Sequence, residues 1–218
     1  MESTTCIGIA PIETNPDHLL SQLTHKEWYL PGLEKKGDHR KCEWLTVRLL
    51  LKEMLGEEKE IRYHDSGKPY LADGSYHLGI SHTKGLVAVI LDRNLQVSID
   101  IEYVSPRVEN IRQRFMSRAE EENISLRNER IHLLLHWSAK ESLYKFLEDT
   151  RIDFQKHLHI LPFDPQMNEW ASFRSKINFP AKEYEPEIRY FATEKYVLTC
   201  ISDANCFLSK QHRALLFS

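Results

Sequence analysis

The chain has 218 residues, of which 29 are basic and 32 acidic, so its formal net charge is −3. This length predicts one large domain or two small ones. The slight acidic excess argues against a general nucleic-acid or polybasic membrane binder, because such a protein would show an excess of lysine and arginine over the whole domain. Glycine is scarce, and none of the eight glycines completes a phosphate-binding loop of the Rossmann or P-loop type. If the chain binds a nucleotide, side chains and a metal must hold its phosphates.

The four cysteines are scattered along the chain and form no metal-binding or disulfide pattern. The first residues show no basic segment followed by an apolar one, so no secretory leader is predicted. The longest apolar run, residues 86–91, is far shorter than the roughly 20 residues that a membrane helix needs. We therefore expect a soluble cytoplasmic protein without a membrane or nucleic-acid partner.

Apolar periodicity and turn residues predict the elements of the first half in chain order. A strand over residues 6–12 is followed by a helix that opens at Asn15-Pro16, where Asn is a good N-cap and Pro a good first residue. A long helix over residues 38–55 ends at Gly56, the usual residue just past a helix end. Short strands are predicted near residues 61–63, 76–81, 86–91 and 96–102.

The second half begins with a helix after Ser105-Pro106 that reaches about residue 116. Ser117 and Glu120 have the spacing of a capping box, and Asn128 caps a long apolar-faced helix. Strands are expected over residues 157–161, 171–179, 188–193 and 196–201, while the last dozen residues are weakly patterned. This order predicts an α+β protein of two comparable lobes, residues 1–103 and 104–218.

Two carboxylates stand close together in the predicted strand near residue 100. Asp100 and Glu102 are two residues apart, so they project from the same face, while Ile99 and Ile101 pack behind it. Two adjacent carboxylates repel each other unless a cation lies between them, and Mg²⁺ is the natural candidate. The alternative is a strand end that leaves the core for solvent, where acidic residues are common.

The long second-half helix places three further side chains on one face. Trp137, Glu141 and Lys145 follow one another at intervals of four residues. A carboxylate and a lysine beside an indole suit a metal-bound polyphosphate. The alternative for Glu141 and Lys145 is an ordinary surface ion pair.

Two further groups of polar residues lie in the first half. Ser81 and His82 stand where a strand ends in a tight turn, and Lys68 lies in a stiff loop between Gly67 and Pro69. Ordinary turn chemistry accounts for each of these equally well. A basic group surrounds the start of the long helix, and it is either a solvated face or a phosphate site at the helix N-terminus: Lys35, Lys36, Arg40, Lys41 and Arg48.

The order of these groups resembles the Sfp-type 4′-phosphopantetheinyl transferases over about residues 35–150. That family's signature is G-I-D-[IV]-E, followed some 40 residues later by [FW]-[SC]-x-K-E-[AS]-x-x-K. The second pattern is complete in residues 137–145, and G-K-P-Y-L and I-S-H-T precede the first one. The first pattern departs at Ser98, where the family has glycine. Because glycine allows close backbone approach, we expect Ser98 to narrow the site without abolishing activity.

The resemblance implies an activity and an architecture. The family transfers the phosphopantetheine arm of coenzyme A to a serine of an apo acyl or peptidyl carrier protein, releasing adenosine 3′,5′-bisphosphate. Its larger members are built of two similar α/β lobes, a pseudo-dimeric fold with coenzyme A and Mg²⁺ in the cleft between the lobes. Because the two-lobe length of this chain would supply both sides of such a cleft, we expect a monomer.

The resemblance also implies roles for individual residues. Asp100, Glu102 and Glu141 would hold Mg²⁺. Lys145, Lys68 and His82 would contact phosphates, Ser81 would position the nucleotide, and Arg40 would bind the 3′-phosphate. The general base would be Glu141 directly, or Glu120 through a water, although Glu120 is equally suited to cap its helix. The segment 107–118, with Arg112, Arg114, Phe115 and Met116, would meet an acidic carrier protein.

Two other functions are compatible with the same residues. One is a Mg²⁺-dependent phosphohydrolase that cleaves a nucleotide diphosphate such as coenzyme A with no carrier protein. The other is a binding module that has kept the fold without catalysis. The intact charged residues Asp100, Glu102, Glu141 and Lys145 argue against the binding module, because such charges are costly without a ligand.

Overall fold

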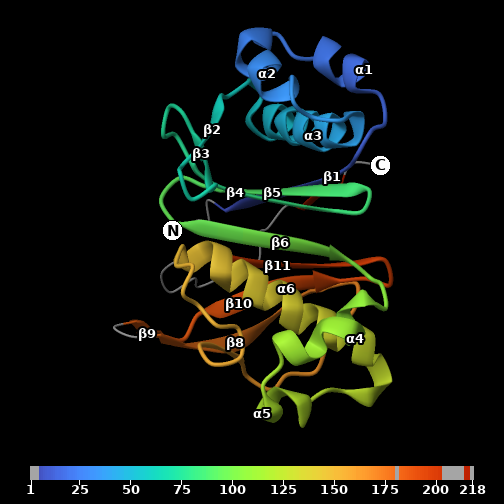
Figure 1. The fold of residues 1–218 in the computed structure, drawn as a ribbon, viewed down its shortest axis with the longest axis vertical. Coiled ribbons are helices and arrows are strands. Elements are labelled where there is room, and N and C mark those ends of the chain that lie inside the picture. Colours follow the sequence, from blue (N-terminus) through green and yellow to red (C-terminus); the bar gives the residue numbers. More distant parts are fainter. Residues whose placement is uncertain (1–4, 180–181, 203–213, 217–218) are drawn as a thin grey trace. The chain divides into compact units, whose positions relative to one another are not determined.

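The computed structural model describes residues 5–179, 182–202 and 214–216 as a mixed α/β chain (Figure 1). The chain divides into two compact units, which are described separately below. The first unit comprises residues 1–97 and 207–218, and the second comprises residues 98–206. The boundary lies at the start of strand β6 (Val97–Tyr103), and the predicted division at residues 103 and 104 stays a prediction.

The first unit is built on a four-stranded sheet with the strand order β12-β1-β5-β4. Strand β5 pairs antiparallel with both β1 and β4, and β12 pairs parallel with β1. A separate two-stranded sheet joins β2 and β3. The strands of this unit are β1 (Cys6–Pro11), β2 (Ile61–Tyr63), β3 (Pro69–Leu71), β4 (His77–Thr83), β5 (Leu86–Asp92) and β12 (Ala214–Leu216).

Three helices lie on one side of the four-stranded sheet: α1 (Pro16–Ser21), α2 (Lys26–Leu33) and α3 (Asp38–Leu55). Helix α3 packs against β1 and β5, and α1 and α2 lie on the side of α3 away from the sheet (Figure 1). Helix α3 ends as predicted, because Gly56 adopts the left-handed conformation (φ +75°) that closes a helix without a Cβ penalty.

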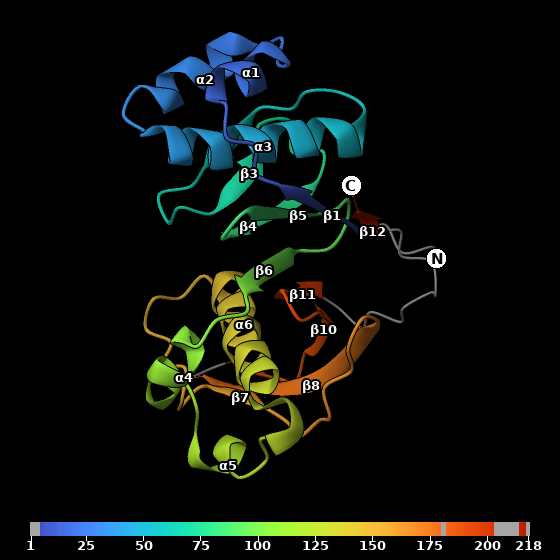
Figure 2. The same ribbon diagram turned by 90° about the vertical axis from the view of Figure 1, so that its right-hand side faces the viewer.

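The second unit contains a six-stranded sheet in which β6, β11, β10, β8 and β7 follow one another and β9 pairs with β8. Helix α6 (Glu129–Leu147) lies against β11, β10 and β7, as Figure 2 shows. Its leucines and Phe146 form the core with the inward residues of the strands. The other elements are α4 (Arg107–Ile111), η1 (Arg112–Arg114), α5 (Arg118–Glu121), η2 (Leu126–Asn128), β7 (Leu158–Ile160), β8 (Trp170–Phe179), β9 (Lys182–Tyr184), β10 (Glu187–Ala192) and β11 (Tyr196–Ser202).

The structure differs from the predicted elements in five places. Helix α2 and the short strands β3 and β9 were not predicted, and part of the last dozen residues forms β12. The helix expected to reach residue 116 ends at Ile111 and continues only as the 3₁₀ turn η1. Helix α2 contains Pro31 and Gly32, which have low helix propensity, so the sequence did not indicate a helix there. Burial of Tyr29 and Leu33 stabilises it.

A buried carboxylate fixes the helices of the first unit. Glu58, whose side chain is 5% exposed, accepts hydrogen bonds from the backbone amides of Thr24 (2.7 Å) and His25 (3.1 Å). It also accepts from the Tyr29 hydroxyl and from Lys52 Nζ, both at 3.1 Å. Burial alone would raise the pKa of Glu58, but these four donors lower it to about 2.

We expect Glu58→Gln to reduce the free energy of unfolding by about 2–3 kcal/mol at pH 7, because charge-assisted hydrogen bonds are lost in a buried site. Urea unfolding followed by circular dichroism measures this. The pKa of Glu58 lies below its ordinary value of 4.5. Its stabilisation is therefore present above about pH 4.5 and disappears as the pH falls toward 2. The matched control is Glu57→Gln, since Glu57 is exposed and pairs only with Lys59 among the described residues; an equal loss in both variants would contradict the prediction.

Candidate active site

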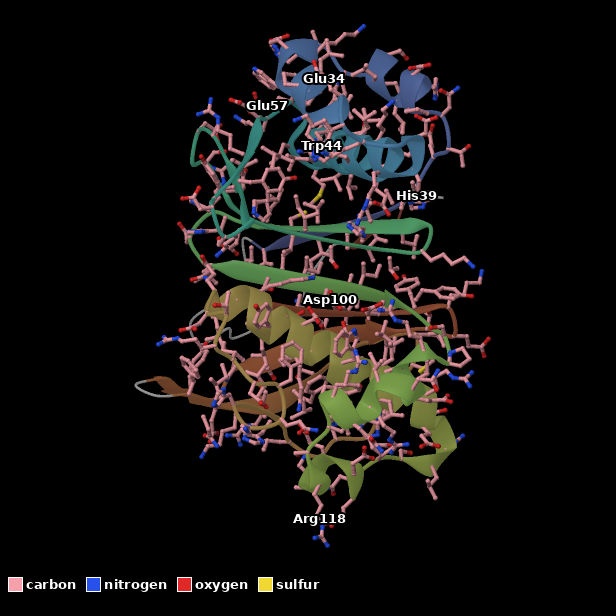
Figure 3. The ribbon with its side chains drawn as sticks, viewed as in Figure 1. Glu34, His39, Trp44, Glu57, Asp100 and Arg118 are labelled. Carbon is pink, nitrogen blue, oxygen red and sulfur yellow. The ribbon has the colours of Figure 1, made fainter. Side chains whose placement is uncertain are left out.

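Strand β6 and helix α6 carry the carboxylates that the sequence singled out. Along β6, Asp100 and Glu102 project from one face, while Ile99 and Ile101 are buried on the other. Along α6, Glu141 lies one helical turn beyond Trp137 and one before Lys145. The second unit therefore brings all of these side chains to the place where β6 faces α6; Figure 3 marks Asp100.

Two contacts join the carboxylates of β6 to α6. Trp137 donates from Nε1 to Glu102 Oε1 at 2.7 Å. Lys145 donates from Nζ to Asp100 Oδ1 at 2.7 Å and to the carbonyl oxygen of Ile99 at 3.3 Å. Lys145 thus supplies a positive charge among the carboxylates and is itself about one-third exposed.

The carboxylates disfavour one another's ionised forms. Burial and the nearby Asp100 carboxylate raise the pKa of Glu141 to about 7; Glu102 adds to the effect and Lys145 opposes it. Burial and Asp100 likewise raise the pKa of Glu102, against the hydrogen bond from Trp137 and the charges of Lys145 and Arg107. A divalent cation bound here would relieve this repulsion.

The donor set fits Mg²⁺ in its chemistry. Mg²⁺ prefers carboxylate oxygens and takes only one or two of them, completing its shell with water and substrate phosphates. Across residues 5–179, 182–202 and 214–216, no three His, Cys, Asp or Glu side chains converge as a preformed metal cage. Asp100, Glu102 and Glu141 therefore lie near one another without forming a cage, and the oxygens of a bound polyphosphate would complete the coordination shell of a metal held there.

Small hydroxyl residues hold β6 close to α6. Ser98 donates to the carbonyl oxygen of Ser142 at 2.8 Å, and Ser138 donates to that of Asp100 at 3.4 Å. The hydroxyls of Ser138 and Ser142 both bond to Thr199 Oγ1 on β11, at 2.9 and 2.8 Å. Ser98, which stands where the resembling family has glycine, therefore bonds to the backbone of α6.

In the first unit, Arg40 and His82 meet around one carboxylate. Arg40 Nη1 donates to Glu43 Oε2 at 2.8 Å and to His82 Nε2 at 3.1 Å. These three residues line a cavity of about 380 Å³, a size suited to a small ligand. The wall also includes Lys36, Trp44, Arg48 and Tyr63.

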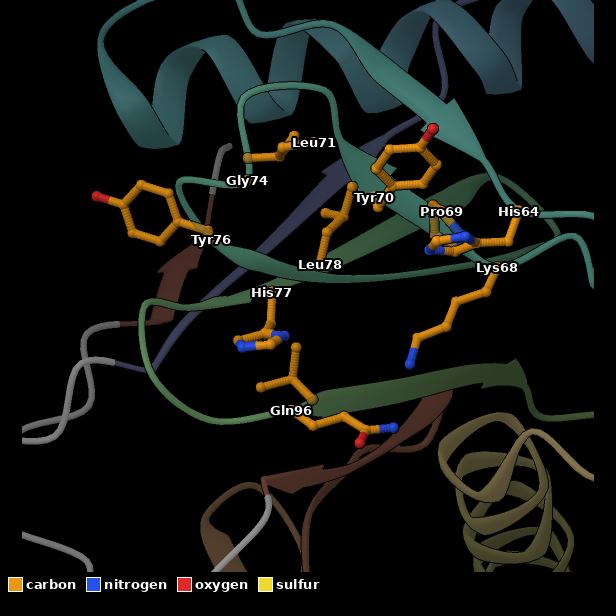
Figure 4. A pocket seen from close by; sticks show the side chains of 11 residues that line it. His64, Lys68, Pro69, Tyr70, Leu71, Gly74, Tyr76, His77, Leu78 and Gln96 are labelled. Atoms are coloured by element: carbon orange, nitrogen blue, oxygen red, sulfur yellow. The ribbon is translucent and has the colours of Figure 1, made fainter.

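Lys68 and Ser81 take different positions in the same unit. Lys68 follows Gly67, whose φ of +84° only glycine adopts easily, and lines a second cavity of about 210 Å³ beside Tyr70 and His77 (Figure 4). Ser81 is largely buried on β4. It was expected where the strand ends in a turn, and the structure instead places it within the strand, opposite Ala88.

The second unit matches a known family. A model of the 4′-phosphopantetheinyl transferase superfamily matches residues 96–201, which include β6 and α6. These residues belong to the 4′-phosphopantetheinyl transferase superfamily. Arg40, Lys68, Ser81 and His82 lie outside this phosphopantetheinyl transferase segment.

Curated relatives are similar over a shorter stretch. The 4′-phosphopantetheinyl transferase AcpT of Salmonella typhi is 33% identical over 69 residues, which are 31% of this chain and 36% of the relative. AcpT of Escherichia coli O157:H7 is 34% identical over 80 residues, 35% of this chain and 41% of the relative. The chain thus spans less than half the length of these relatives. No helix among the described residues is long and apolar enough to cross a membrane.

Glu120, a predicted base of the phosphopantetheinyl transferase segment, forms the capping box with Ser117. Its Oε2 accepts from Lys140 Nζ (2.8 Å) and the Ser117 amide (2.7 Å), and its Oε1 accepts from the Ile160 amide (2.8 Å). Both side chains are buried, Lys140 completely. Burial opposes the ionisation of Glu120, but Lys140 and these amides lower its pKa. The geometry favours a structural ion pair, so the catalytic role of Glu120 stays a prediction that we do not adopt.

Residues 107–118, which were expected to meet a carrier protein, do not present all of the predicted side chains at the surface. Phe115 and Met116 are buried in the core, and Arg112 forms ion pairs with Glu121 and Glu129. Arg118, by contrast, extends into solvent (Figure 3). The pattern of arginines and apolar residues over 107–118 therefore reflects the packing of α4 and α5 on α6.

Sequence reasoning missed Lys140 and did not separate Arg48 from its basic neighbours. Lys140 lies on the apolar stripe of α6, with Leu143 one turn later, and this position could have indicated a buried, paired lysine. Arg48 is buried on α3 against Trp44, a contact that helical spacing of four residues would allow.

We expect Glu120→Gln to reduce the free energy of unfolding by about 3–5 kcal/mol, because the Lys140 charge is left buried without an anion. Chemical unfolding at neutral pH measures this. Glu122→Gln on the same turn is the control, since Glu122 is exposed and pairs with the exposed Arg118. A stable Glu120→Gln variant would contradict a structural role.

Proposed function

We propose that the chain transfers the 4′-phosphopantetheine arm of coenzyme A to a serine of an apo acyl or peptidyl carrier protein, releasing adenosine 3′,5′-bisphosphate. The observation that carries the proposal is the pairing of Asp100 and Glu102 on β6 with Glu141 and Lys145 on α6. This pairing falls inside the matched segment and reproduces the spacing of the family's two sequence patterns.

Asp100, Glu102 and Glu141 would hold Mg²⁺, which when bound neutralises charge that develops on the pyrophosphate. Lys145 Nζ, which lies 2.7 Å from Asp100 Oδ1, would turn toward a phosphate oxygen of the substrate. The contact of Trp137 with Glu102 keeps that carboxylate in place. These residues stabilise charge without a glycine-rich loop.

Glu141 suits the role of general base. In its ionised form, which is also the form that binds Mg²⁺, the Glu141 carboxylate accepts a proton. The carrier serine oxygen would attack the phosphorus that bears the pantetheine arm. Its proton would pass to Glu141, and the bond to the departing adenosine 3′,5′-bisphosphate would break.

The resemblance assigns the nucleotide end of coenzyme A to residues of the first unit. Arg40 and His82 line a basic cavity suited to the 3′-phosphate, and Lys68 would contact the pyrophosphate. Ser81, which lies on β4, would position the nucleotide. From the resemblance alone, we also propose the pseudo-dimeric arrangement of two lobes, a monomeric enzyme and a cytoplasmic location.

The test is a mass measurement on apo carrier proteins incubated with the enzyme, coenzyme A and Mg²⁺. We expect each accepted carrier to gain one phosphopantetheine. Glu141→Gln should reduce the rate by about 10²–10⁴-fold, because the base is lost. The matched control is Glu194→Gln, which changes an exposed glutamate of the same unit outside the site and should leave the rate unchanged.

The same assay separates transfer from hydrolysis. A phosphohydrolase would consume coenzyme A without a carrier and leave the carrier mass unchanged, which would overturn the proposal. Glu141→Gln at the wild-type rate would show that the chemistry lies elsewhere.

Mg²⁺ affinity should depend on pH through Glu141. The raised pKa means that Glu141 is protonated below about pH 7, and only its ionised form binds the metal. The apparent affinity should therefore fall, by up to about tenfold per pH unit below 7, while Glu141→Gln binds more weakly with a flatter dependence. Calorimetric titration of Mg²⁺ between pH 6 and 8 in both proteins measures this. Identical pH profiles would contradict the assignment.

A further inference from the structure

Ser98 is the residue at which this chain departs from the first sequence pattern of the resembling family. Ser98, Asp100 and Glu102 follow one another at intervals of two residues along β6, so their side chains share one face of the strand. The Ser98 hydroxyl donates to the carbonyl oxygen of Ser142 on α6 at 2.8 Å. Because Ser98 is only 3% exposed, it affects the candidate site through α6 and not through contact with a ligand.

The bond fastens β6 to the turn of α6 that carries Glu141. Ser142 directly follows Glu141, well inside the helix. A carbonyl oxygen inside a helix accepts one bond from the amide four residues later, and its second lone pair can accept from a hydroxyl. Ser98 therefore bonds to α6 without disturbing the helix. A glycine at position 98 has no side chain and cannot form this bond.

Three side chains on this face of β6 bond to different parts of α6, beside which the strand lies (Figures 1 and 2). Glu102 accepts from Trp137 and Asp100 accepts from Lys145, both at 2.7 Å. Along the helix, the bond of Ser98 falls between these two. Contacts spread over about two helical turns fix the register of the strand on the helix.

Of these three bonds, the one made by Ser98 is independent of ligand binding. Under the proposed function, Lys145 turns from Asp100 toward a substrate phosphate, and the carboxylate of Asp100 binds the metal. The Ser98 hydroxyl and the Ser142 carbonyl have no part in binding. Their bond therefore still holds β6 against α6 when the ion pair of Lys145 with Asp100 is lost. Mg²⁺ demands nearly ideal geometry from its ligands, so a constant spacing of the carboxylates favours its binding.

We propose that Ser98 is a positioning residue of the candidate site, whose bond to Ser142 holds Asp100 and Glu141 at the spacing that Mg²⁺ needs. The inference rests on the proposed function, in which these carboxylates bind the metal. It concerns a feature of this chain, since the resembling family has glycine at this position.

The test is calorimetric titration of the full chain with Mg²⁺, in the wild type and in Ser98→Ala. This substitution removes the hydroxyl but keeps the Cβ, so the strand gains none of the backbone freedom of glycine. We expect an affinity about 3- to 10-fold weaker, which is the range that one ordinary hydrogen bond supplies. The Mg²⁺ concentration for half-maximal transfer should rise by a similar factor, while the rate at saturating Mg²⁺ falls less. Ser98→Thr keeps the hydroxyl and should retain most of the affinity.

Ser175→Ala is the matched control. Ser175 is completely buried on β8 and donates to the carbonyl oxygen of Pro186 at 2.9 Å, so the variant loses the same kind of bond. This bond joins β8 to the residue before β10, outside the candidate site. The melting temperature should fall in both serine variants, but the Mg²⁺ affinity should fall only in Ser98→Ala.

The outcomes separate this inference from the proposed function. A wild type that binds Mg²⁺ and modifies a carrier, with both properties unchanged in Ser98→Ala, would overturn the role of Ser98 alone. Equal weakening of Mg²⁺ binding in Ser98→Ala and Ser175→Ala would show a general loss of stability and overturn it too. A wild type that neither binds Mg²⁺ nor modifies a carrier would overturn the proposed function together with this inference.

Discussion

The close approach of β6 to α6 is the constraint on which the candidate site depends. Asp100 and Glu102 come from a strand, and Glu141 and Lys145, 39 or more residues later in the sequence, come from a helix. They face one another because small hydroxyl side chains occupy the contact between the two elements. Ser138 and Ser142 of α6 and Thr199 of β11 are smaller than the side chains that would hold a helix farther from a sheet, and their hydroxyls form hydrogen bonds with one another. A larger side chain at Ser138 or Ser142 would move the helix away and separate the carboxylates.

Local patterns predicted the elements that carry this site, because their signals are contained in a few neighbouring residues. The cap at Gly56, the capping box at Ser117 and the alternation around Asp100 are all of this kind. Helix α2 and strand β12 were missed because they are stabilised by residues distant in sequence. β12 forms only by pairing with β1, at the opposite end of the chain. Tertiary contacts of this type override local propensity and leave no local signal.

The residue types of the candidate site could be predicted from the sequence, but the surroundings of each side chain could not. Spacing alone placed Asp100 and Glu102 on one face of a strand and Glu141 and Lys145 on one face of a helix. It left Glu120 equally suited to catalysis and to capping. Only the structure shows the buried Lys140 that engages Glu120. Similarly, the sequence grouped Arg48 with four basic neighbours. The structure separates it from them, because Trp44 and Tyr63 enclose it, while Arg40 pairs with Glu43 and Lys41 pairs with Asp38.

The direction of the pKa shifts separates two kinds of buried charge in this chain. Glu58 and Glu120 are surrounded by donors, and their pKa values lie below the ordinary range, so the folded protein itself stabilises their ionised forms. Glu102 and Glu141 have raised pKa values, and Arg48 a lowered one, so folding disfavours these charges. A fold retains such charges at a cost in stability when something outside the chain completes them. Under the proposed function, the partner of the Glu102 and Glu141 carboxylates is Mg²⁺.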